Sequence, residues 1–412
     1  MDNNTSIDPA NITTTWVSAP NQRGTIDIIW SSFFTIFLCT WTTLCLNIPP
    51  PSDSNSKQFG RRLKWMFLAI IYPEVVFAIA IGQYASAKQS VKQFHRLGYL
   101  NWTLRHAFFA DMGGLLIRPL DNAPFVVNSY QFAKLVEEQC VEYPNITAEE
   151  IWDKSKADTL SRLLSLLQAS WLILQLLGRA ILRLPTSTLE LSAGALVICT
   201  FGTFLCWLHK PSDVRRGFVL AANVTTADIL SLTEGGLTEP YKYNLNVFSR
   251  SSLYVGDHKI KESMRRQPED LPGYFSNDRI NISTMGGYHI AAVLVVSIAF
   301  TSSYLIAWHF VFPTQIESLL WRISSLAAMG SVILTWVFEA VIIRFQNGRW
   351  RWKAANGGNK LFPTWWVILK AALLYLTFSV RWYMIVESLI GLRKLPVGVF
   401  QTFDVAEVFP HW

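Results

Sequence analysis

The sequence predicts an all-α integral membrane protein, a helical bundle of about seven transmembrane helices with one re-entrant or interfacial segment. Hydrophobic residues make up 51% of the 412 residues and charged residues only 16%, whereas soluble domains carry about 25% charge. Seven mostly apolar runs reach about 20 residues, the length that crosses the core of a bilayer. The 17 Trp and 26 Phe suit repeated contact with membrane interfaces, where aromatic rings concentrate.

The N-terminal part begins with a polar tail, residues 1–27, and continues with the first two predicted transmembrane helices, residues 28–84. The tail lacks the basic-then-apolar order of a cleavable signal peptide, so the first helix is expected to serve as the insertion signal. Apolar runs at 28–47 and 65–84 predict the two helices. Three consecutive prolines from Pro49 end the first helix, because proline lacks an amide donor.

Residues 85–160 are predicted to form a loop with amphipathic stretches. Within it, the segment 107–117, AFFADMGGLLI, is apolar but too short to span a bilayer. Its two glycines permit a break in the chain, so it is the predicted re-entrant or interfacial element. Thr147 followed by Glu150 predicts a capping box that opens a helix leading into the third span.

The rest of the chain predicts five more transmembrane helices around one long polar loop. Helices 3 and 4 are expected within residues 161–208 and helices 5 to 7 within 288–390, followed by a C-terminal tail at 391–412. Between them, residues 209–287 are rich in Ser, Thr, Gly and charges and show no clear period, which predicts a loop. The apolar runs that predict these five helices are 161–183, 189–208, 288–310, 318–343 and 364–390.

Two charge signals bear on orientation, and they disagree. The loop 48–64 carries four basic residues, so the positive-inside rule places it in the cytoplasm, the N-terminus outside and, after seven crossings, the C-terminus inside. The basic stretch 344–360 would then lie outside, against the same rule. In this topology the glycosylation sequons all lie outside. They are at Asn3, Asn4, Asn11, Asn101, Asn145, Asn223 and Asn281.

Composition and motifs argue against several classes of function. The formal net charge of +7 comes mostly from Lys and Arg clusters beside apolar runs, which indicates topology determinants or lipid-headgroup contacts, and no nucleic-acid partner is expected. The sequence has no P-loop, zinc-protease motif, nucleophile elbow or paired aspartate-rich diphosphate motif, so no cofactor and no metal are predicted. Four of the five cysteines lie in apolar segments and Cys140 in a loop; all are interpreted as structural.

Ionisable side chains within or beside the apolar runs are the candidate functional groups, because an unpaired charge at bilayer depth costs from about 3 to more than 10 kcal/mol. Arg381 and Glu387 are six residues apart on one helix and face different directions, so Glu339 is the expected partner of Arg381. For Glu339 and Glu387, structural pairing, proton chemistry and ligand contact all stay open. The full set is Glu74, Arg179, His309, Glu339, Lys370, Arg381 and Glu387.

Some of these residues have a structural alternative. His106 and Asp111 flank an apolar wedge and could form the floor of a pocket or anchor an interfacial segment. Arg179, Lys370 and His309 could extend to an interface through their long or amphipathic side chains. The residues predicted to be catalytic are Glu339, Glu387, Asp111 and His106, and those predicted to contact substrate are Arg381, Trp336 and Trp382.

Four stretches resemble a large group of multipass membrane proteins of filamentous fungi, mostly of undescribed function. The resemblance covers both ends and the middle of the chain, and it implies a fungal source and the architecture above, with no catalytic residues to transfer. Residues 209–287 show no such resemblance. The four stretches are RGTIDIIWSSFFTIFLCTWTTLCLNIP (23–49), HAFFADMGG (106–114), DKSKADTLSRLLSLLQASWLILQ (153–175) and RWYMIVESLIGLRKLPVGVFQTFDVAEVFPHW (381–412).

Three functions fit these observations. As an enzyme of lipid-like or secondary-metabolite biosynthesis in the endoplasmic reticulum or plasma membrane, the protein would use a buried carboxylic acid to protonate an apolar small molecule delivered from the bilayer, for example in a terpenoid cyclisation. As a transporter, channel or receptor, it would use the same carboxylates to carry protons or hold a cation, with Arg381 as counter-charge. As a scaffold of a biosynthetic assembly, it would use them only to lock helices together.

Overall fold

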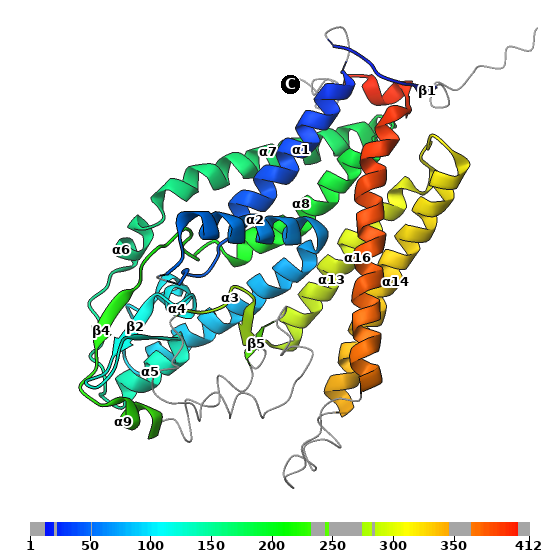
Figure 1. The fold of residues 1–412 in the computed structure, drawn as a ribbon. Helices are drawn as coiled ribbons and strands as arrows, with labels where there is room; N and C mark the ends of the chain where they lie inside the picture. Colours follow the sequence, from blue (N-terminus) through cyan, green and yellow to red (C-terminus); the bar gives the residue numbers. More distant parts are fainter. Residues whose placement is uncertain are drawn as a thin grey trace, which may run out of the picture.

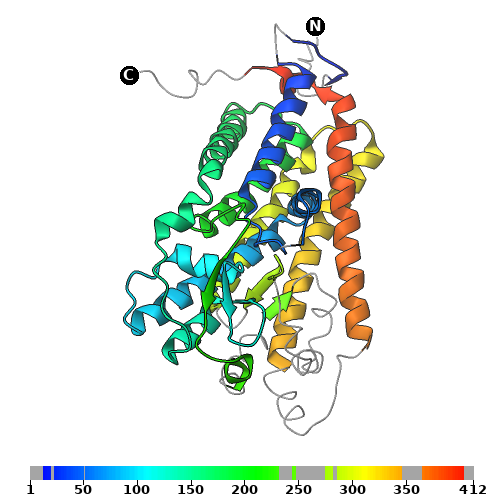
Figure 2. The ribbon, with the colours of Figure 1, turned by 60° about the vertical axis from the view of Figure 1, so that its left-hand side comes forward.

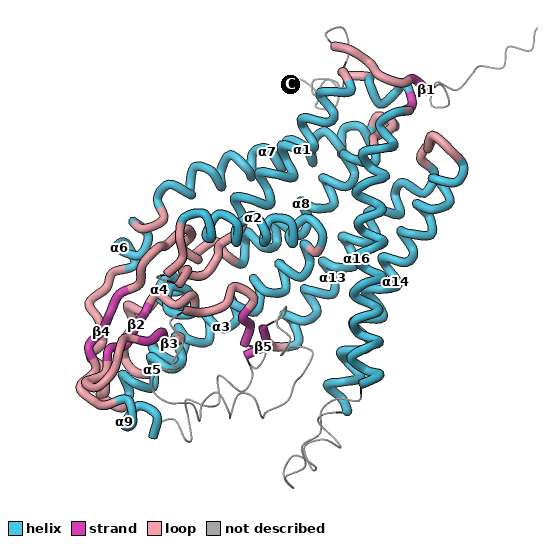
Figure 3. The backbone as a smooth tube through the Cα atoms, in the orientation of Figure 1, coloured by secondary structure: helices cyan, strands magenta, loops and turns pink. Residues whose placement is uncertain are grey.

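The computed structural model describes residues 13–19, 23–50, 52–231, 244–246, 274–281, 285–345 and 364–402. Long helices form an elongated bundle, and short helices and strands form a smaller unit at one end of it (Figure 1, Figure 3). We call this smaller unit the end domain and define it as residues 97–155, 207–231 and 274–281. The protein is therefore mostly helical, as the sequence predicts.

Six helices of the described chain are long and apolar enough to cross a membrane. They are α1 (Thr25–Thr43), α7 (Lys156–Ile181), α8 (Thr188–Cys206), α13 (Gly287–Ser303) with its 3₁₀ continuation η4 (Tyr304–His309), α14 (Gln315–Phe345) and α16 (Thr364–Ile390). They match the first and the third to seventh predicted spans. Their outward faces expose large apolar side chains, among them Trp30, Leu167 and Ile306.

The predicted second span, 65–84, is not one straight helix. The chain forms α2 (Asn55–Ile71) and α3 (Pro73–Arg96), which are bent by 111° relative to one another. Tyr72 lies between them outside helical geometry, and Pro73 begins α3, where its missing N–H costs nothing. An angle above 90° turns the chain back, so α2 crosses the bundle and α3 runs toward the end domain (Figure 1).

Most of residues 85–160 fold instead of forming a loop. Strand β2 (Leu115–Arg118) pairs antiparallel with β3 (Phe125–Val127) and parallel with β4 (Phe218–Ala221), which brings the two polar stretches of the sequence into one sheet. Aromatic rings pack in the core beside this sheet. The ring centroids of Phe94 and Trp102 are 4.0 Å apart. The other elements here are α4 (Leu104–Asp111), α5 (Ser129–Glu137), α6 (Ala148–Asp153), α9 (Thr226–Ser231), β5 (Asn244–Asn246) and β6 (Arg279–Asn281).

The segment 107–117, the predicted re-entrant or interfacial element, belongs to the end domain. It contains the end of α4 and the start of β2, both within the end domain. Gly113 has φ +90°, which glycine adopts without strain, and a Cβ on Gly114 would lie 2.4 Å from the Phe109 ring. The two glycines therefore close a tight helix-to-strand turn.

The predicted capping box is confirmed. The Thr147 hydroxyl accepts from the Glu150 N–H at 3.1 Å, and Glu150 Oε2 accepts from the Thr147 N–H at 2.9 Å. These bonds satisfy amide donors that a helix start leaves free. They open α6, which leads into α7 after a short turn at residues 154–155.

The two ends of the described chain lie together at the end of the bundle opposite the end domain (Figure 2). Strand β1 (Thr13–Thr14) pairs antiparallel with β7 (Leu395–Pro396), which lies between the 3₁₀ turns η6 (Gly391–Arg393) and η7 (Val397–Phe400). The prediction that the termini lie on opposite sides is therefore wrong. It depended on a straight helix through residue 72, where the chain instead turns back.

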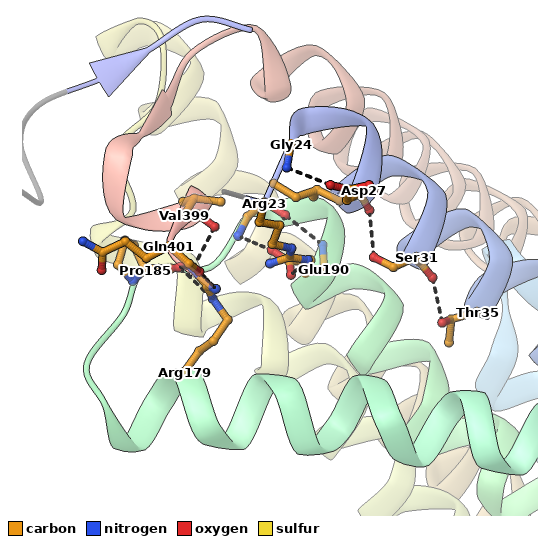
Figure 4. Close-up of polar contacts among 12 residues, drawn as sticks. Arg23, Gly24, Asp27, Ser31, Thr35, Arg179, Pro185, Glu190, Val399 and Gln401 are labelled. Carbon is orange, nitrogen blue, oxygen red and sulfur yellow. Dashed lines mark hydrogen bonds and ion pairs between the residues drawn. The ribbon is translucent and has the colours of Figure 1, made fainter. Parts of the chain in front are cut away.

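A buried arginine fastens these ends to the bundle (Figure 4). Arg179 at the end of α7 is 1% exposed, so the prediction that it extends to an interface is wrong. Its guanidinium donates to the carbonyl oxygens of Pro185, Gly398, Val399 and Gln401 at 2.7–3.1 Å. Beside it, Arg23 Nη2 lies 2.5 Å from Oε1 of the buried Glu190, and the Arg23 N–H donates to the Phe400 carbonyl. We call this set of contacts the terminal clasp.

Candidate functional site

A polar pocket lies where the end domain meets the bundle. Its wall comes from the loop after α1, from α3 and α4, from the start of α5, from the turn after α8 and from β6. Its empty volume is about 480 Å³, part of which is open to solvent. The lining residues are Asn47, Gln83, Ser86, Phe108, Asp111, Met112, Asn128, Tyr130, Lys210 and Arg279.

Lys210 is the buried charge of this pocket. It is only 2% exposed, and its Nζ donates to Asn47 Oδ1 at 3.0 Å and to Gln83 Oε1 at 2.9 Å. Its ammonium also lies 4.8 Å from the centre of the Trp207 ring, a favourable cation–π distance. Burial lowers the pKa of Lys210 from 10.5 to about 8, because neutral partners compensate only part of the lost hydration.

The two amides are held with their oxygens toward Lys210. The Asn47 Nδ2 group donates to the Ser276 carbonyl at 2.8 Å, and the Asn47 N–H donates to Asn277 Oδ1 at 2.7 Å. Gln83 Oε1 also accepts from Trp207 Nε1 at 3.0 Å. Segments far apart in sequence therefore fix these acceptors before any ligand arrives.

Local structure explains why Lys210 points inward. Helix α8 ends at Cys206, with Trp207 as its C-cap, and the Lys210 N–H donates to the Trp207 carbonyl at 3.0 Å in the turn that follows. Pro211 comes next and disfavours further helix. The turn places the Lys210 side chain against Gln83 of α3.

Asp111 lies in the same pocket, as the sequence prediction of a pocket residue at this position suggests. Its Oδ2 accepts from the Ser86 hydroxyl at 2.9 Å, and its Oδ1 accepts from the N–H and the hydroxyl of Ser129 at 2.9 and 2.7 Å. Ser129 is the first residue of α5, so the carboxylate also caps a helix start. Asp111 thus has a clear structural role at the edge of the pocket.

His106 is not among the lining residues of this pocket. Its Nδ1 accepts from the Thr103 N–H at 3.2 Å, and its Nε2 lies 2.9 Å from the Ile146 carbonyl oxygen. Burial lowers the pKa of His106 below 6.5, which favours the neutral ring that these contacts need. His106 joins α4 to the segment before α6 and does not share a site with Asp111.

Arg381 pairs with Glu74. Arg381 Nη1 lies 2.7 Å from Glu74 Oε1 and donates to the Ile71 carbonyl at 2.8 Å. The guanidinium also lies 5.3 Å from the ring centres of Tyr72 and Phe300. Arg381 thereby holds the bend between α2 and α3 against α16. Glu339 belongs to α14, and its side chain lies outside the described residues.

The other predicted residues are dispersed over the bundle. Glu387 is 4% exposed and faces the Tyr383 hydroxyl, and its Oε1 has no hydrogen-bond partner among the described residues. Trp336 packs near Phe77, whereas Trp382 is 52% exposed and faces outward. His309 is exposed as well, and the Lys370 side chain lies outside the described residues. The described members of the predicted interior set do not converge on one site.

Lys210, Asn47 and Gln83 were not predicted as site residues. Lys210 follows an apolar run by a few residues, where lysines ordinarily mark topology, and amides carry no distinctive motif. Only their convergence from three segments marks the site. Within the described part of the chain, no group of three or more His, Cys, Asp or Glu side chains is arranged to hold a metal ion.

Residues 1–236 and 279–412 match DUF8562, a family of unknown function, and the chain belongs to this family. The matched part includes every lining residue of the pocket. No curated protein and no solved structure matches the chain.

Proposed function

We propose that the protein is a multi-pass membrane protein that binds a small molecule with its polar group against Lys210. The main observation that supports this proposal is a buried lysine whose direct partners are two neutral amide oxygens at the wall of a polar pocket. A buried ammonium without a carboxylate in contact is costly, and perturbed ionisable groups in pockets are typical of functional sites. Phe108 and Met112 add apolar surface to the same wall, which suits an amphiphilic ligand.

The proposed membrane topology has six crossings. Six apolar helices of the described chain, and two described chain ends at the same end of the bundle, support an even number of crossings, with α2 and α3 turning back without crossing. The basic loop 48–64 and the helix ends that the basic stretch 344–360 connects then lie on the same side as the end domain. The positive-inside rule places that side in the cytoplasm. This arrangement removes the conflict between the two charge signals.

Ligand extraction tests the binding function. The wild-type chain, Lys210→Met and Lys134→Met would be purified from the native host in mild detergent, and bound small molecules extracted and compared by mass spectrometry. Lys134 is an exposed lysine of α5 paired with Glu137, so its variant controls for the loss of one positive charge. We expect one compound to be enriched with the wild type and Lys134→Met and lost from Lys210→Met. Identical extracts from all three proteins would contradict the proposal.

We further propose that this molecule belongs to lipid-like or secondary-metabolite biosynthesis. The apolar surface of Phe108 and Met112, beside a membrane bundle, supports a ligand that partitions into the bilayer. Deletion of the gene followed by metabolite profiling tests this role. Loss of one compound with accumulation of a precursor is the expected result, and an unchanged profile would contradict it.

A second candidate function is the movement of protons or ions through the bundle. It is favoured by Glu387, whose buried carboxylate has one oxygen without a partner among the described residues. Reconstitution of the wild type and Glu387→Gln into liposomes with a pH-sensitive dye tests it. A proton flux that is equal in both proteins would argue against a role for this carboxylate.

A further inference from the structure

A second group of polar side chains lies far from the Lys210 pocket, at the end of the bundle where the two described chain ends meet. Glu387 comes from the last turn of α16, and Glu317 comes from the first turn of α14. The Tyr383 hydroxyl faces Glu387 and lies 3.5 Å from the Glu317 carbonyl oxygen. Thr188, the first residue of α8, adds a second hydroxyl. Three helices of the bundle therefore place oxygen atoms in one region.

The two carboxylates are enclosed without a full set of partners. The Glu387 side chain is 4% exposed, and its Oε1 atom is buried with no hydrogen-bond partner among the described residues. The same holds for Glu317 Oε2. A buried carboxylate oxygen that accepts no hydrogen bond is costly, because it has lost its hydration without a replacement. Each carboxylate thus keeps one oxygen available to a ligand.

The ionisable side chains of this region carry an excess of one negative charge. Arg393 Nη2 pairs with Glu317 Oε1, the oxygen opposite the unpartnered one. Within the described part of the chain, Glu387 itself forms no ion pair. Two carboxylates and one guanidinium leave one negative charge, and a buried charge without its counter-charge is unfavourable. One monovalent cation would balance it.

Gly391 keeps the space beside these oxygen atoms free of a side chain. A Cβ atom on Gly391 would lie 3.6 Å from Thr188 Oγ1 and 3.9 Å from Glu387 Oε1. Apart from its chain neighbours and the backbone of its own helix, it would meet no other described atom within 4 Å. The hydroxyl of α8 and the unpartnered carboxylate oxygen of α16 therefore border the same small space.

We infer that Glu387, Glu317 and Thr188 form a binding site for a monovalent metal cation, of which Na⁺ and K⁺ are the common examples. Such hard cations take oxygen ligands. Glu387 Oε1 and Glu317 Oε2 supply the charged ligands, and the hydroxyls of Thr188 and Tyr383 supply neutral ones. In the six-crossing arrangement this end faces away from the cytoplasm, so the ion comes from the outer solution. The site needs neither the Lys210 pocket nor any movement of ions across the membrane.

Thermal unfolding of the purified chain in neutral detergent tests the site. The chloride salts of sodium, potassium and choline are compared at one pH and at matched ionic strength, with choline as the cation too large to enter. The proteins are the wild type, Glu387→Gln, Gly391→Ala and the control Gly330→Ala.

Gly391→Ala is the sharper variant, because it changes no charge. Its methyl group fits the protein at ordinary contact distances of 3.6 and 3.9 Å, and it occupies the space that the ion needs. It therefore keeps the test valid if Glu387→Gln fails to fold. Gly330 lies in α14 and a Cβ there meets nothing within 4 Å, so Gly330→Ala controls for the loss of a helical glycine.

The expected result is a rise in the unfolding temperature of the wild type and Gly330→Ala as sodium or potassium replaces choline. The apparent affinity for the ion should be weaker by about ten-fold or more in Glu387→Gln and Gly391→Ala, because a charged ligand or its space is lost. The inference is overturned if choline stabilises the wild type as well as the metal cations do. It is also overturned if Glu387→Gln and Gly391→Ala respond to the metal cations as the wild type does.

This site and the proposed functions fail in different ways. If a metal cation stabilises the wild type through Glu387 while liposomes show no ion flux, the cation site stands and only the transport candidate falls. If the compound bound at Lys210 is retained in Gly391→Ala while cation stabilisation is lost, the two sites are independent. A chain that loses its Lys210 ligand and still responds to sodium leaves the cation site intact.

Discussion

Arg381 in α16 and Glu74 in the first turn of α3 form a buried ion pair, with Nη1 and Oε1 2.7 Å apart. The two residues are separated by about three quarters of the chain, and both side chains are almost fully enclosed. The same guanidinium holds the Ile71 carbonyl, one residue before the bend at Tyr72. The ion pair therefore joins the last long helix to the point where the chain turns back.

Removing one partner of this pair should destabilise the fold. Glu74→Gln leaves Arg381 buried without its counter-charge, which costs about 3–5 kcal/mol when one partner of a buried pair is lost. Glu137→Gln, which breaks the exposed pair with Lys134, should cost less than about 1 kcal/mol. Thermal unfolding in detergent measures both. The double variant Glu74→Gln/Arg381→Met should recover part of the loss, and a double variant as unstable as the sum of the single variants would contradict the pairing.

The buried state of Lys210 predicts a specific pH dependence. Its pKa is about 8 in the folded chain and 10.5 when unperturbed, so between these values the unfolded chain binds more protons and stability rises with pH. The destabilisation caused by burying the charged Lys210 ammonium is complete below pH 8 and relieved above pH 10.5. It amounts to about 3 kcal/mol at most. The unfolding temperature of the ligand-free wild type should therefore rise relative to that of Lys210→Met from pH 7.5 to pH 10. A constant difference over this range would show that Lys210 is not held in a buried environment.

The six-crossing arrangement predicts opposite labelling of two exposed lysine positions. Lys57 lies in α2 near the end domain, and Lys394 lies at the opposite end, beside β7. In intact cells, an impermeant maleimide should label Lys394→Cys and leave Lys57→Cys unreacted until the membrane is opened. The chain without added cysteines is the reference, since four of its five native cysteines are buried. Labelling of both positions from one side would contradict the arrangement.

The terminal clasp predicts that one arginine controls both chain ends. Arg179→Met removes the donors to four carbonyl oxygens, of which those of Gly398 and Val399 are buried, and unsatisfied buried groups each cost about 1–3 kcal/mol. We expect a large drop in unfolding temperature and faster proteolysis after residue 390. Arg183→Met changes an exposed arginine of the same segment and should have little effect. Equal protease resistance of the two variants would show that the clasp does not hold the C-terminal segment.

Six of the seven predicted spans were found because a run of about 20 apolar residues has few alternatives to a long helix. The capping box at Thr147 and Glu150 was found for a similar reason, since it depends on residues three positions apart. The run 65–84 was misread, because hydropathy does not register a bend at Tyr72 and Pro73. The apolar segment 107–117 lies in the folded end domain, and its apolar residues are needed for the core of that domain.

The candidate site was harder to predict than the fold. Asp111 was selected because it stands in an apolar segment, and it does line the pocket. Lys210 was not selected, because its burial depends on Asn47 and Gln83, which are more than 120 residues away. The sequence predicts Glu74 as an interior charge but does not pair it with Arg381, because the bend that brings them together is not visible in the sequence.

The sequence by itself determined the helical class, the approximate positions of six apolar helices and the capping box at Thr147 and Glu150, because these properties depend on neighbouring residues and on the exclusion of apolar surface from water. Tertiary structure alone decided the turn at Tyr72, the shared end of the two termini, the ion pair of Arg381 with Glu74 and the pocket around Lys210. Each of these depends on contacts between residues distant in the chain. Such contacts form only when packing balances the cost of burying polar groups, and no local pattern records that balance.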